Sequence, residues 1–561
     1  MLLDFPGGAR LYRDPGEVVE ARTAAEVEPA LERLRGRHAA GFLGFEAGHA
    51  LERKLAPIAR DAAAGAPPLL WFGLFDGYEA VDVAAVLPDA AGARAGRPKP
   101  LIERAVYEAQ AARVREHIFA GDAYQVNLTF QAEVSVTGHP VALYAGLKLR
   151  AQAGWGAVVF TGTHWILSLS PELFFTLDPD RRVTARPMKG TAAAGSDPEA
   201  LRADPKQRAE NLMIVDLIRN DLSRVSKPGT VKVPELFAVE RFPTVLQMTS
   251  TVTAELEAGI GPVELLRATF PCGSVTGAPK IRAMEIIDEL EAGARGVYTG
   301  SVGAVAPDGG AAFNVAIRTL SLRAGESVAR MGLGSGLVAD SEADDEWREC
   351  LAKGAFVEDR RSFDLIETMR FDPEEGLADL DRHLARMKRS ADAFGFPFDR
   401  HDARNELQAA TFPSRGARRL RLLLSPSGTI AIEVRAMPKA PDEPVAVAVV
   451  PLPVEPEDFR LRHKTSDRLF YDDARAAAGA FEVVFEDGHE FLTEGSFTSL
   501  FVEREGVLVT PPLARGLLPG VLRERLIAEG RAVEGELRRE DLAAGFYIGN
   551  AVRGLIEARL R

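Results

Sequence analysis

Short apolar runs along the first 360 residues follow one another in pairs, with turn residues between the two members of each pair. In 302–320, for example, two runs rich in Val and Ala flank the turn sequence Pro-Asp-Gly-Gly. Between the pairs, apolar residues recur every three to four positions over 101–120, 209–222 and 281–290, and this spacing predicts amphipathic helices. Paired strands with helices between them favour antiparallel sheet covered by outer helices, so we expect an α+β fold class.

Two features of this pattern give specific expectations. The helix predicted over 101–120 places Val106, Ala109, Val114 and Ile118 on one face, which we expect to pack against the core. Three runs have the length of strands, and they cover residues 157–161, 165–170 and 301–306.

Breaks in composition indicate two domains. Residues 89–100 are rich in Ala, Gly and Pro and predict a flexible connection, and a second break at 354–362 follows a predicted helix that ends at Gly354. The last 200 residues have their own mixture, with helices predicted over 379–394 and 520–529 and strands between them. The expected domains are 1–360, made of an N-terminal segment over residues 1–90 and a catalytic core over residues 100–355, and 361–561.

Composition and charge exclude several classes of protein. Of the 561 residues, 46% are hydrophobic and 27% are charged, which is typical of a globular protein and not of a disordered or fibrous one. The net charge of −13 argues against binding nucleic acid through bulk charge. No apolar run reaches the roughly 18–20 residues that a membrane span needs, and the first residues do not resemble a signal peptide. The two cysteines, Cys272 and Cys350, suit a reducing compartment, so we expect a cytoplasmic protein that binds neither nucleic acid nor membrane.

Several carboxylates have a spacing that suits a metal site. Glu346 and Glu349 lie three residues apart on a predicted helix and therefore share a face, with Lys353 one turn later. Glu210 lies near the start of another predicted helix. Magnesium is often held by one or two carboxylates together with substrate oxygens. Taken alone, these residues fit either half of a magnesium site or solvated helix faces with salt bridges.

Two glycine-rich segments lack the residues of known nucleotide-binding motifs. The segment 273–280 ends in Ala-Pro-Lys and not in the Gly-Lys-Ser/Thr of a phosphate loop. The segment 332–337 has Leu337 where a dinucleotide fingerprint needs its third glycine. Both segments can still bring backbone N–H groups close to an anionic ligand.

Eight segments in a fixed order together resemble one enzyme family. They are GDAYQVNL (121–128), SPELF (170–174), RPMKGT (186–191), AENLMIVDLIRNDLSRV (209–225), FPCGSVTGAPKIRAMEIIDELE (270–291), YTGSVGAVAPDG (298–309), FNVAIRT (313–319) and GLGSGLVADSEADDEWRECLAK (332–353). The set is similar to the chorismate-utilising enzymes, which include anthranilate, isochorismate and salicylate synthases and component I of aminodeoxychorismate synthase. The resemblance covers 100–355 closely and 1–90 more loosely, and it implies large antiparallel sheets with outer helices.

Lys189 carries the most specific implication of this resemblance. It stands in Pro-Met-Lys-Gly-Thr, where aminodeoxychorismate synthases carry lysine and anthranilate synthases resemble Pro-x-Ala-Gly-Thr. An unprotonated lysine amine can displace the ring hydroxyl of chorismate and form a covalent adduct, after which ammonia adds at the para position. Glu172, in Ser-Pro-Glu, matches the general acid that protonates the departing hydroxyl. Gln125 stands where water-activating relatives carry a lysine base, which favours ammonia as the nucleophile.

The resemblance also implies a magnesium site and a substrate site. Glu210 and Glu349 match the magnesium ligands, with Glu346 nearby, and the ion would hold the ring carboxylate of chorismate. Arg318 and Lys353 match the groups that bind the enolpyruvyl carboxylate. The other substrate-binding residues implied are Gln125, Thr191 and, through their backbone, Gly334 and Gly336.

The sequence shows no glutaminase motif that could supply ammonia. A glutaminase needs a nucleophilic cysteine in Gly-x-Cys-x-Gly, whereas Cys272 follows Pro271 inside the chorismate motif and Cys350 lies on the predicted metal-binding helix. We therefore expect ammonia to come from solution or from a separate glutamine amidotransferase subunit. Gln247 stands where many relatives have histidine, and we assign it no role.

Residues 362–561 resemble a second family, the fold-type IV pyridoxal-phosphate enzymes. The matching segments are IETMR (366–370), HLARMKRS (383–390), HKTSDR (463–468), LTEGSFTSLFV (492–502), LLPGVLRERL (517–526) and IGNAVRGL (548–555). This family contains branched-chain and D-amino-acid aminotransferases and aminodeoxychorismate lyase. The resemblance implies a domain of two mixed α/β subdomains that binds pyridoxal 5′-phosphate.

The roles implied for this second domain concern the cofactor. Lys464 matches the lysine that joins the cofactor aldehyde and later moves the proton, and Glu494 matches the carboxylate that pairs with the pyridine nitrogen. Arg386 matches an arginine that grips the cofactor phosphate. The remaining cofactor-binding residues are Ser499, where relatives often have Asn, the helix start at Gly520, Val521 and Leu522, and the turn at Asn550 and Ala551.

Together the two resemblances imply a bifunctional enzyme of 4-aminobenzoate synthesis, a folate precursor. The first domain would convert chorismate and ammonia to 4-amino-4-deoxychorismate, and the second would eliminate pyruvate from that product. Two alternatives stay open: an anthranilate synthase fused to an aminotransferase, and a synthase whose C-terminal domain is a non-catalytic dimerisation module. A homodimer through the C-terminal domain is also left open.

Overall fold

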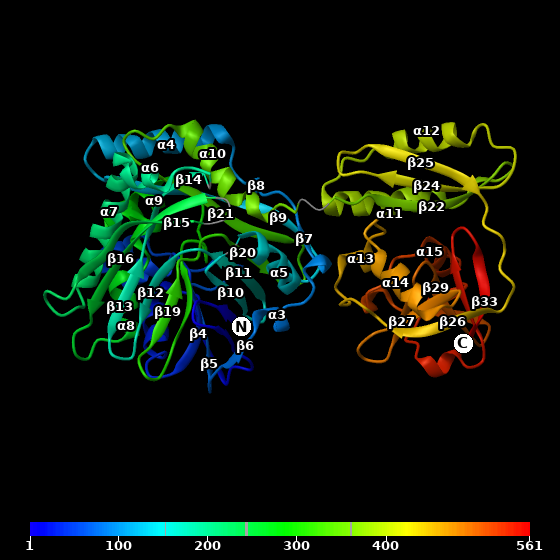
Figure 1. Cartoon of the computed structure of the whole chain (residues 1–561), viewed down its shortest axis with the longest axis horizontal. Helices are drawn as coiled ribbons and strands as arrows, with labels where there is room; N and C mark the ends of the chain where they lie inside the picture. Colours follow the sequence, from blue (N-terminus) through cyan, green and yellow to red (C-terminus); the bar gives the residue numbers. More distant parts are fainter. Residues whose placement is uncertain (152, 194, 242–244, 360–361) are drawn as a thin grey trace. The chain divides into compact units, whose positions relative to one another are not determined.

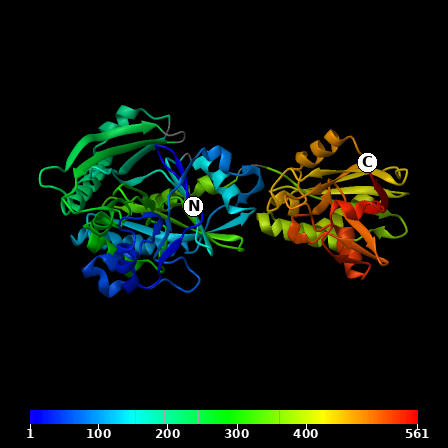
Figure 2. The same ribbon diagram turned by 90° about the horizontal axis from the view of Figure 1, so that it is seen from below.

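The computed structural model describes residues 1–151, 153–193, 195–241, 245–359 and 362–561 (Figure 1). The chain forms two compact units. The first contains residues 1–87, 97–136 and 144–358, and the second contains 88–96, 137–143 and 359–561. In Figure 2 the yellow-to-red portion of the chain belongs to the second unit. The domain boundary expected at 360–361 lies outside the described residues.

An eleven-stranded sheet carries much of the first unit, and its neighbouring strands pair antiparallel. Its longest strands, β9 (Gln125–Thr137) and β21 (Val328–Leu337), pair along ten residues, which brings Gly336 opposite Asn127. The other ordered strands are β17 (Gly277–Ala278), β20 (Thr319–Arg323), β11 (His164–Ser170), β10 (Trp155–Phe160), β1 (Leu2–Asp4), β2 (Ala9–Leu11) and β6 (Glu79–Val81), while β7 (Arg94–Ala95) and β8 (Lys99–Pro100) pair with β9 at its side.

A ten-stranded antiparallel sheet forms the second layer of strands in this unit. Its order is β14 (Met188–Ala193), β16 (Val245–Glu255), β13 (Arg182–Arg186), β12 (Leu173–Leu177), β19 (Ala311–Asn314), β18 (Ser301–Val305), β4 (His38–Leu43), β5 (Leu70–Phe75) and β3 (Glu17–Ala21), with β15 (Lys232–Arg241) pairing with β16. One hydrophobic core joins this sheet to helices, and it includes Phe72, Val183 and Ile214. The expected α+β class with large antiparallel sheets and outer helices is confirmed.

The helices of the first unit lie outside these sheets (Figure 1). The longest is α7 (Pro205–Ser223), which begins where the Asp204 side chain accepts hydrogen bonds from the N–H groups of Lys206 and Gln207. The others are α1 (Ala24–Glu32), α2 (Ala47–Leu51), α3 (Val83–Val86), α4 (Arg104–Phe119), α5 (Pro140–Ala151), α6 (Pro198–Ala203), α8 (Pro262–Thr269), α9 (Lys280–Leu290) and α10 (Ala343–Gly354), with short 3₁₀ turns at Arg53–Ile58, Gly273–Val275 and Ala355–Val357. The 3₁₀ turn at Ala90–Gly92 belongs to the second unit.

Two expectations about this unit are partly wrong. Helix α4 buries Tyr107, Ala111 and Val114, whereas Val106 is 46% exposed and Ala109 is also exposed. The buried face is therefore shifted, because the aromatic ring of Tyr107 packs inward against Phe130 and Trp347. The segment 89–100 is not a flexible connection at its end, since β8 pairs with β9.

The second unit contains two sheets with their own helices. A four-stranded sheet orders β23 (Gly376–Leu377), β22 (Leu365–Asp372), β24 (Arg418–Leu424) and β25 (Ile430–Ala436), and its core includes residues of α11 (Leu380–Phe394) and α12 (Arg400–Thr411). An eight-stranded mixed sheet orders β28 (Leu492–Gly495), β27 (Glu482–Glu486), β26 (Val445–Pro451), β33 (Gly554–Leu560), β32 (Phe546–Asn550), β29 (Ser499–Arg504), β30 (Val507–Thr510) and β31 (Ala532–Glu534).

Helices α13 (Phe459–Arg462), α14 (Leu469–Ala478) and α15 (Val521–Ala528) accompany the eight-stranded sheet, with 3₁₀ turns at Leu513–Arg515 and Arg539–Leu542. The helix expected over 520–529 is α15, and Gly520 is its N-cap. The expected pair of mixed α/β subdomains is confirmed. No helix in the described ranges has the length and apolar character that crossing a membrane requires.

Two candidate active sites

Lys189 lies on β14 at a point where the strand is irregular. The pairing of β14 with β16 shifts register between Met188 and Thr191, and Gly190 between them has a φ of +100°, which a side chain would strain. From helix α7, the Asn211 side-chain amide donates to the Lys189 carbonyl at 3.1 Å. The backbone on both sides of the lysine is therefore fixed by its neighbours.

The Lys189 amine and the Gln125 amide converge beside Gly336. A Cβ atom added to Gly336 would lie 2.8 Å from Lys189 Nζ and 3.1 Å from Gln125 Nε2, so the absence of a side chain leaves room for both groups. Gln125 is fully buried, and neither its Nε2 nor its Oε1 has a hydrogen-bond partner within the described residues. Leaving a buried amide unpaired costs free energy, so this point suits a polar atom of a ligand.

Glu172 is a buried carboxyl group in the loop between β11 and β12. It is 4% exposed, and the Ser274 hydroxyl donates to its Oε1 at 2.7 Å. Burial raises the pKa of Glu172 to about 7, although the Ser274 hydrogen bond and the charges of Lys189 and Lys353 act in the opposite direction. A carboxyl group with this pKa is partly protonated at neutral pH and can act as an acid.

Arg318 and Lys353, the two residues expected to bind a substrate carboxylate, have different surroundings. Arg318 lies over the ring of Phe356 at 5.8 Å, and burial lowers the pKa of its guanidinium. Lys353 Nζ donates to the Gly334 carbonyl at 3.0 Å and pairs with Glu349 at 2.7 Å. Gly334 therefore contacts Lys353 through its carbonyl oxygen.

Gln247, which received no role from the sequence, supports the strand that carries Lys189. Its Nε2 donates to the Gly190 carbonyl at 2.9 Å, and its Oε1 accepts from the Thr191 hydroxyl at 3.1 Å. Only the position of Gln247 across β14 and β16 reveals this contact, because nothing in its local sequence indicates it.

The three carboxylates expected near magnesium each have another partner. Glu210 pairs with Lys189 at 3.5 Å, Glu349 pairs with Lys353, and Glu346 accepts from the Ser341 hydroxyl at 2.6 Å. Burial raises the pKa of the Glu349 carboxyl group, but the charges of neighbouring lysines, above all Lys353, lower it by more. The net pKa is below the ordinary value, so the carboxyl group is ionised at neutral pH. Among the described residues, no three acidic, histidine or cysteine side chains form a ready metal cluster. Magnesium is often held by one or two carboxylates together with substrate oxygens and water, so a site made of Glu210 and Glu349 stays a prediction.

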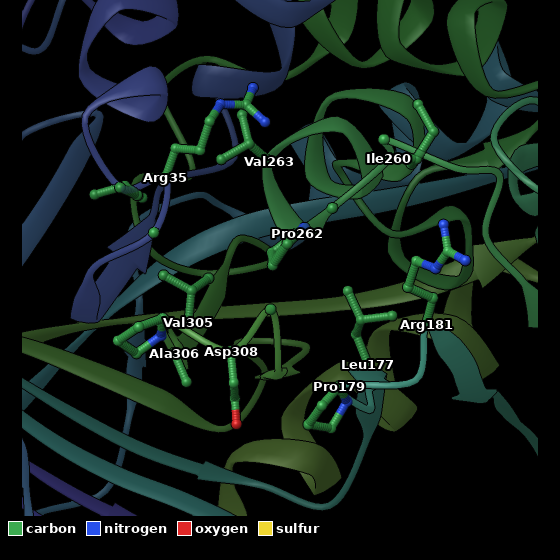
Figure 3. Close-up of a pocket in the computed structure, with 16 residues that line it drawn as sticks. Arg35, Leu177, Pro179, Arg181, Ile260, Pro262, Val263, Val305, Ala306 and Asp308 are labelled. Atoms are coloured by element: carbon green, nitrogen blue, oxygen red, sulfur yellow. The ribbon is translucent and has the colours of Figure 1, made fainter.

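One cavity in the first unit lies away from these residues (Figure 3). It has a volume of about 340 Å³ and is lined by Arg35, Arg181, Asp308 and the residues that lead into α8. None of the site residues expected from the sequence lines it. The candidate site is therefore defined by converging side chains and not by this cavity.

In the second unit, Lys464 lies between α13 and α14 and faces the four-stranded sheet. Its carbonyl accepts from the Ile366 N–H at 2.8 Å, and its Nζ donates to the Thr368 hydroxyl at 3.2 Å. Burial and the nearby Arg386 lower the pKa of Lys464 to about 7. A substantial fraction of this amine is thus neutral at pH 7 and able to react with an aldehyde.

Glu494 on β28 is 5% exposed, and burial raises its pKa to about 8. The Tyr471 hydroxyl donates to Glu494 Oε1 at 2.7 Å and favours the charged form. Tyr471 was not expected from the sequence; it is a buried aromatic residue on α14, seven positions after Lys464, and its type alone gives no functional signal.

Arg386 on α11 is held by a buried carboxylate. Its guanidinium donates to both oxygens of Glu367 at 2.8 and 2.7 Å, and its Nη1 donates to the Pro519 carbonyl at 2.9 Å. His383 also bonds to Glu367, and despite burial these partners lower the pKa of Glu367 to about 2. The arginine is therefore fixed next to the N-terminus of α15.

The residues expected around the cofactor phosphate gather at this helix start. A Cβ atom on Gly520 would lie 2.6 Å from Ser499 Oγ, so the glycine leaves a cradle between the helix and β29. Asn550 Oδ1 accepts from the N–H groups of Val552 and Arg553, which shapes the turn that contains Ala551. A buried amine, a buried carboxyl group and an anion cradle fit pyridoxal phosphate together.

Two family models match this chain. The chorismate binding enzyme model matches residues 9–359, and the amino-transferase class IV model matches residues 364–560. The aminodeoxychorismate synthase component 1 of Klebsiella aerogenes is 42% identical over 259 residues, which cover 45% of this chain and 57% of that protein. The anthranilate synthase component 1 of Streptomyces coelicolor is also 42% identical, over 260 residues that cover 45% of this chain and 50% of that protein.

The chain thus spans about half the length of these curated relatives. Among solved structures, anthranilate synthase component I from Streptococcus pneumoniae has a TM-score of 0.55 and 26% identity. That likeness covers 63% of this chain and 93% of the other. Overall similarity therefore does not separate the two aminating reactions.

Proposed function

The chain belongs to the chorismate-binding enzyme family, and from this premise we propose that it makes 4-aminobenzoate in two steps. The first unit aminates chorismate to 4-amino-4-deoxychorismate, and the second removes pyruvate from that product. The proposal includes a separate glutamine amidotransferase as the ammonia source, because the two cysteines lie in other motifs.

One observation carries the choice of reaction: the Lys189 amine lies beside Gly336 and the unpartnered amide of Gln125. A lysine at this point can act as a nucleophile toward a bound ring, which an alanine cannot. Since the two kinds of relative are equally similar over the matched region, this residue supports amination at the para position over anthranilate formation.

The proposed chemistry balances with these groups. The Lys189 amine attacks the ring carbon next to the one that bears the carboxylate, the carbon–oxygen bond of the para hydroxyl breaks, and Glu172 gives the proton that lets water leave. Ammonia then attacks the para carbon, the bond to Lys189 breaks, and the proton lost by ammonia returns to Glu172. The net change replaces the hydroxyl group of chorismate by an amino group and releases water.

Glu210 and Glu349 would hold magnesium, which neutralises the charge of the ring carboxylate when it is bound. Arg318 and Lys353 supply positive charge for the second carboxylate of the substrate. Gln125 offers both a donor and an acceptor where ammonia approaches, because its amide is unpartnered among the described residues.

In the second unit, Lys464, Glu494, Arg386 and the start of α15 would hold pyridoxal phosphate, which when bound withdraws electrons from the amino-bearing carbon of the substrate. Lys464 is the amine that moves the proton from that carbon, and its pKa of about 7 suits both directions of transfer. Loss of this proton and of pyruvate makes the ring aromatic, which yields 4-aminobenzoate.

Product analysis tests both steps together. Purified protein is incubated with chorismate, an ammonium salt, magnesium and pyridoxal phosphate, and products are separated by liquid chromatography. We expect 4-aminobenzoate, and without pyridoxal phosphate we expect 4-amino-4-deoxychorismate. A major product of 2-aminobenzoate would contradict the first step, and 4-amino-4-deoxychorismate that persists with the cofactor would contradict the second.

A further inference from the structure

The segment 269–280 connects several elements of the N-terminal site, yet the proposed function gives it no role. Its strand β17 pairs with Val126 and Gln125 of β9. Gly273 packs closely against α7, since a Cβ atom there would lie 2.4 Å from a methyl group of Leu217. The same segment contacts Glu172 through Ser274. One short segment therefore reaches the elements that carry Gln125, Glu210 and Glu172.

Lys280 fixes the path of this segment. Its Nζ donates to Asp221 Oδ2 at 2.6 Å and to the carbonyl groups of Thr269 and Pro271 at 2.8 and 3.3 Å. Asp221 is 5% exposed, and burial raises the pKa of its carboxyl group, although the charge and hydrogen bond of Lys280 act in the opposite direction. The lysine ties both the start and the end of the segment to helix α7.

Two backbone N–H groups at the centre of the segment bond within the segment itself. The N–H of Val275 bonds to the Cys272 carbonyl, and the N–H of Thr276 bonds to the Gly273 carbonyl. These two donors are therefore occupied. What the centre presents to the site is the Ser274 hydroxyl, 2.7 Å from Glu172 Oε1.

The backbone of Glu172 is held separately from its carboxyl group. The Glu172 N–H donates to the Ser170 hydroxyl at 3.1 Å, and the Glu172 carbonyl accepts from the Val315 N–H at 3.0 Å. These contacts set where the side chain starts, and the contact with Ser274 sets the direction in which the carboxyl group points.

We propose that Ser274 is a positioning residue whose hydroxyl, held in place by the Lys280 contacts, orients the Glu172 carboxyl group for proton transfer to the departing hydroxyl of the substrate. The inference rests on the proposed function, because it takes Glu172 as the acid. An acid must lie within hydrogen-bond reach of its target, and a misplacement of about 1 Å can cost on the order of a hundredfold in rate.

The pKa of the Glu172 carboxyl group depends on the groups around it. Its value can therefore show whether Ser274 contacts the carboxyl group or only supports the fold. Lys189 from β14 and Lys353 from α10 face the carboxyl group, and so does the thiol of Cys272, which burial keeps protonated by raising its pKa to about 12. Since Ser274 donates to the charged form of Glu172, its removal raises the pKa of the carboxyl group above its present value of about 7.

The test compares Ser274→Ala with Ser274→Thr in the full chain. The turnover of chorismate is measured from pH 6 to 9 with an ammonium salt, free ammonia held constant and magnesium saturating. An acid must be protonated, so activity falls as pH rises through its pKa. We expect Ser274→Ala to move this fall upward by about one pH unit and to lower the maximal rate about tenfold, and Ser274→Thr to restore both.

Ser226→Ala is the matched control, because Ser226 is also buried and its hydroxyl has no partner within the described residues. Its pH profile should equal that of the unaltered protein. A Ser274→Ala profile that does not shift overturns the inference. Glu172→Gln separates the two proposals: full activity in this variant refutes the acid itself, whereas lost activity together with an unshifted Ser274→Ala profile refutes only the role of Ser274.

Discussion

Lys189 Nζ lies 3.5 Å from Glu210 Oε2, so the amine proposed to attack chorismate is paired with a carboxylate proposed to bind magnesium. The pair joins β14 to α7, and the same helix holds the Lys189 carbonyl through Asn211. This places the amine in the site before any substrate arrives. The two side chains therefore have separable roles, which substitution can distinguish.

Lys189→Ala should abolish para amination while leaving the fold intact, because the nucleophile is lost but its backbone contacts stay. We expect formation of 4-amino-4-deoxychorismate to fall more than about a hundredfold, with 2-aminobenzoate as the remaining product. Lys227→Ala is the control, since that lysine pairs with Glu255 on the surface. Unchanged 4-aminobenzoate output from Lys189→Ala would rule out the covalent role.

Gly336→Ala should impair amination through a steric effect alone. The new methyl group would lie 2.8 Å from Lys189 Nζ and 3.1 Å from Gln125 Nε2, so one of these groups must move. We expect a fall in turnover of at least about tenfold with an unchanged melting temperature. Gly293→Ala, where an added Cβ meets nothing within 4 Å, is the matched control. Equal turnover in both variants would show that the amine and amide need not converge there.

The sequence predicted the residues that occupy motifs, and the structure brings several of them together. Lys189, Gln125 and Gly336 come from three strands of two sheets, yet their roles could be assigned because each lies in a segment of characteristic order. The register of β9 against β21, which sets Gly336 opposite Asn127, explains only the proximity of Gly336 and Gln125. The proposed metal ligands are less complete, because Glu346 bonds to Ser341 and no three-ligand cluster forms within the described ranges.

Supporting residues could not be predicted, since tertiary packing alone makes them neighbours. Tyr471 meets Glu494 across 23 positions of sequence, and Gln247 meets Gly190 across 57. The error in α4 has a different cause. The spacing of aliphatic residues predicted that Val106 faces the core. The aromatic side chain of Tyr107 buries more surface, so the face of α4 that carries Tyr107 packs against the core instead.

Gly520→Ala should weaken the binding of pyridoxal phosphate through its phosphate group. The added methyl group would lie 2.6 Å from Ser499 Oγ and fill the cradle at the start of α15. We expect the dissociation constant for pyridoxal phosphate, measured by absorbance titration, to rise at least about tenfold, a change of about 1.4 kcal/mol. Pyridoxal, which lacks the phosphate, should bind both forms equally.

The control for this cradle is Gly488→Ala, because an added Cβ at Gly488 meets nothing within 4 Å. It should leave both dissociation constants unchanged. If Gly520→Ala weakened pyridoxal as much as pyridoxal phosphate, the substitution would be distorting the whole site, and the phosphate would have to lie elsewhere.

Attachment of pyridoxal phosphate to Lys464 should depend on pH with a midpoint near 7. Burial and Arg386 lower the pKa of this lysine from its ordinary value near 10.5 to about 7, and only the neutral amine reacts with the aldehyde. The neutral fraction rises as pH increases through the pKa, so labelling trapped by borohydride and located by mass spectrometry should grow from pH 6 to pH 8. Surface lysines in the same digest are the internal control, because they stay protonated until about pH 9 or above. Half-maximal labelling of Lys464 above about pH 9 would show that the pKa of its amine is not lowered. The Lys464→Arg variant should lose this label, and it should accumulate 4-amino-4-deoxychorismate.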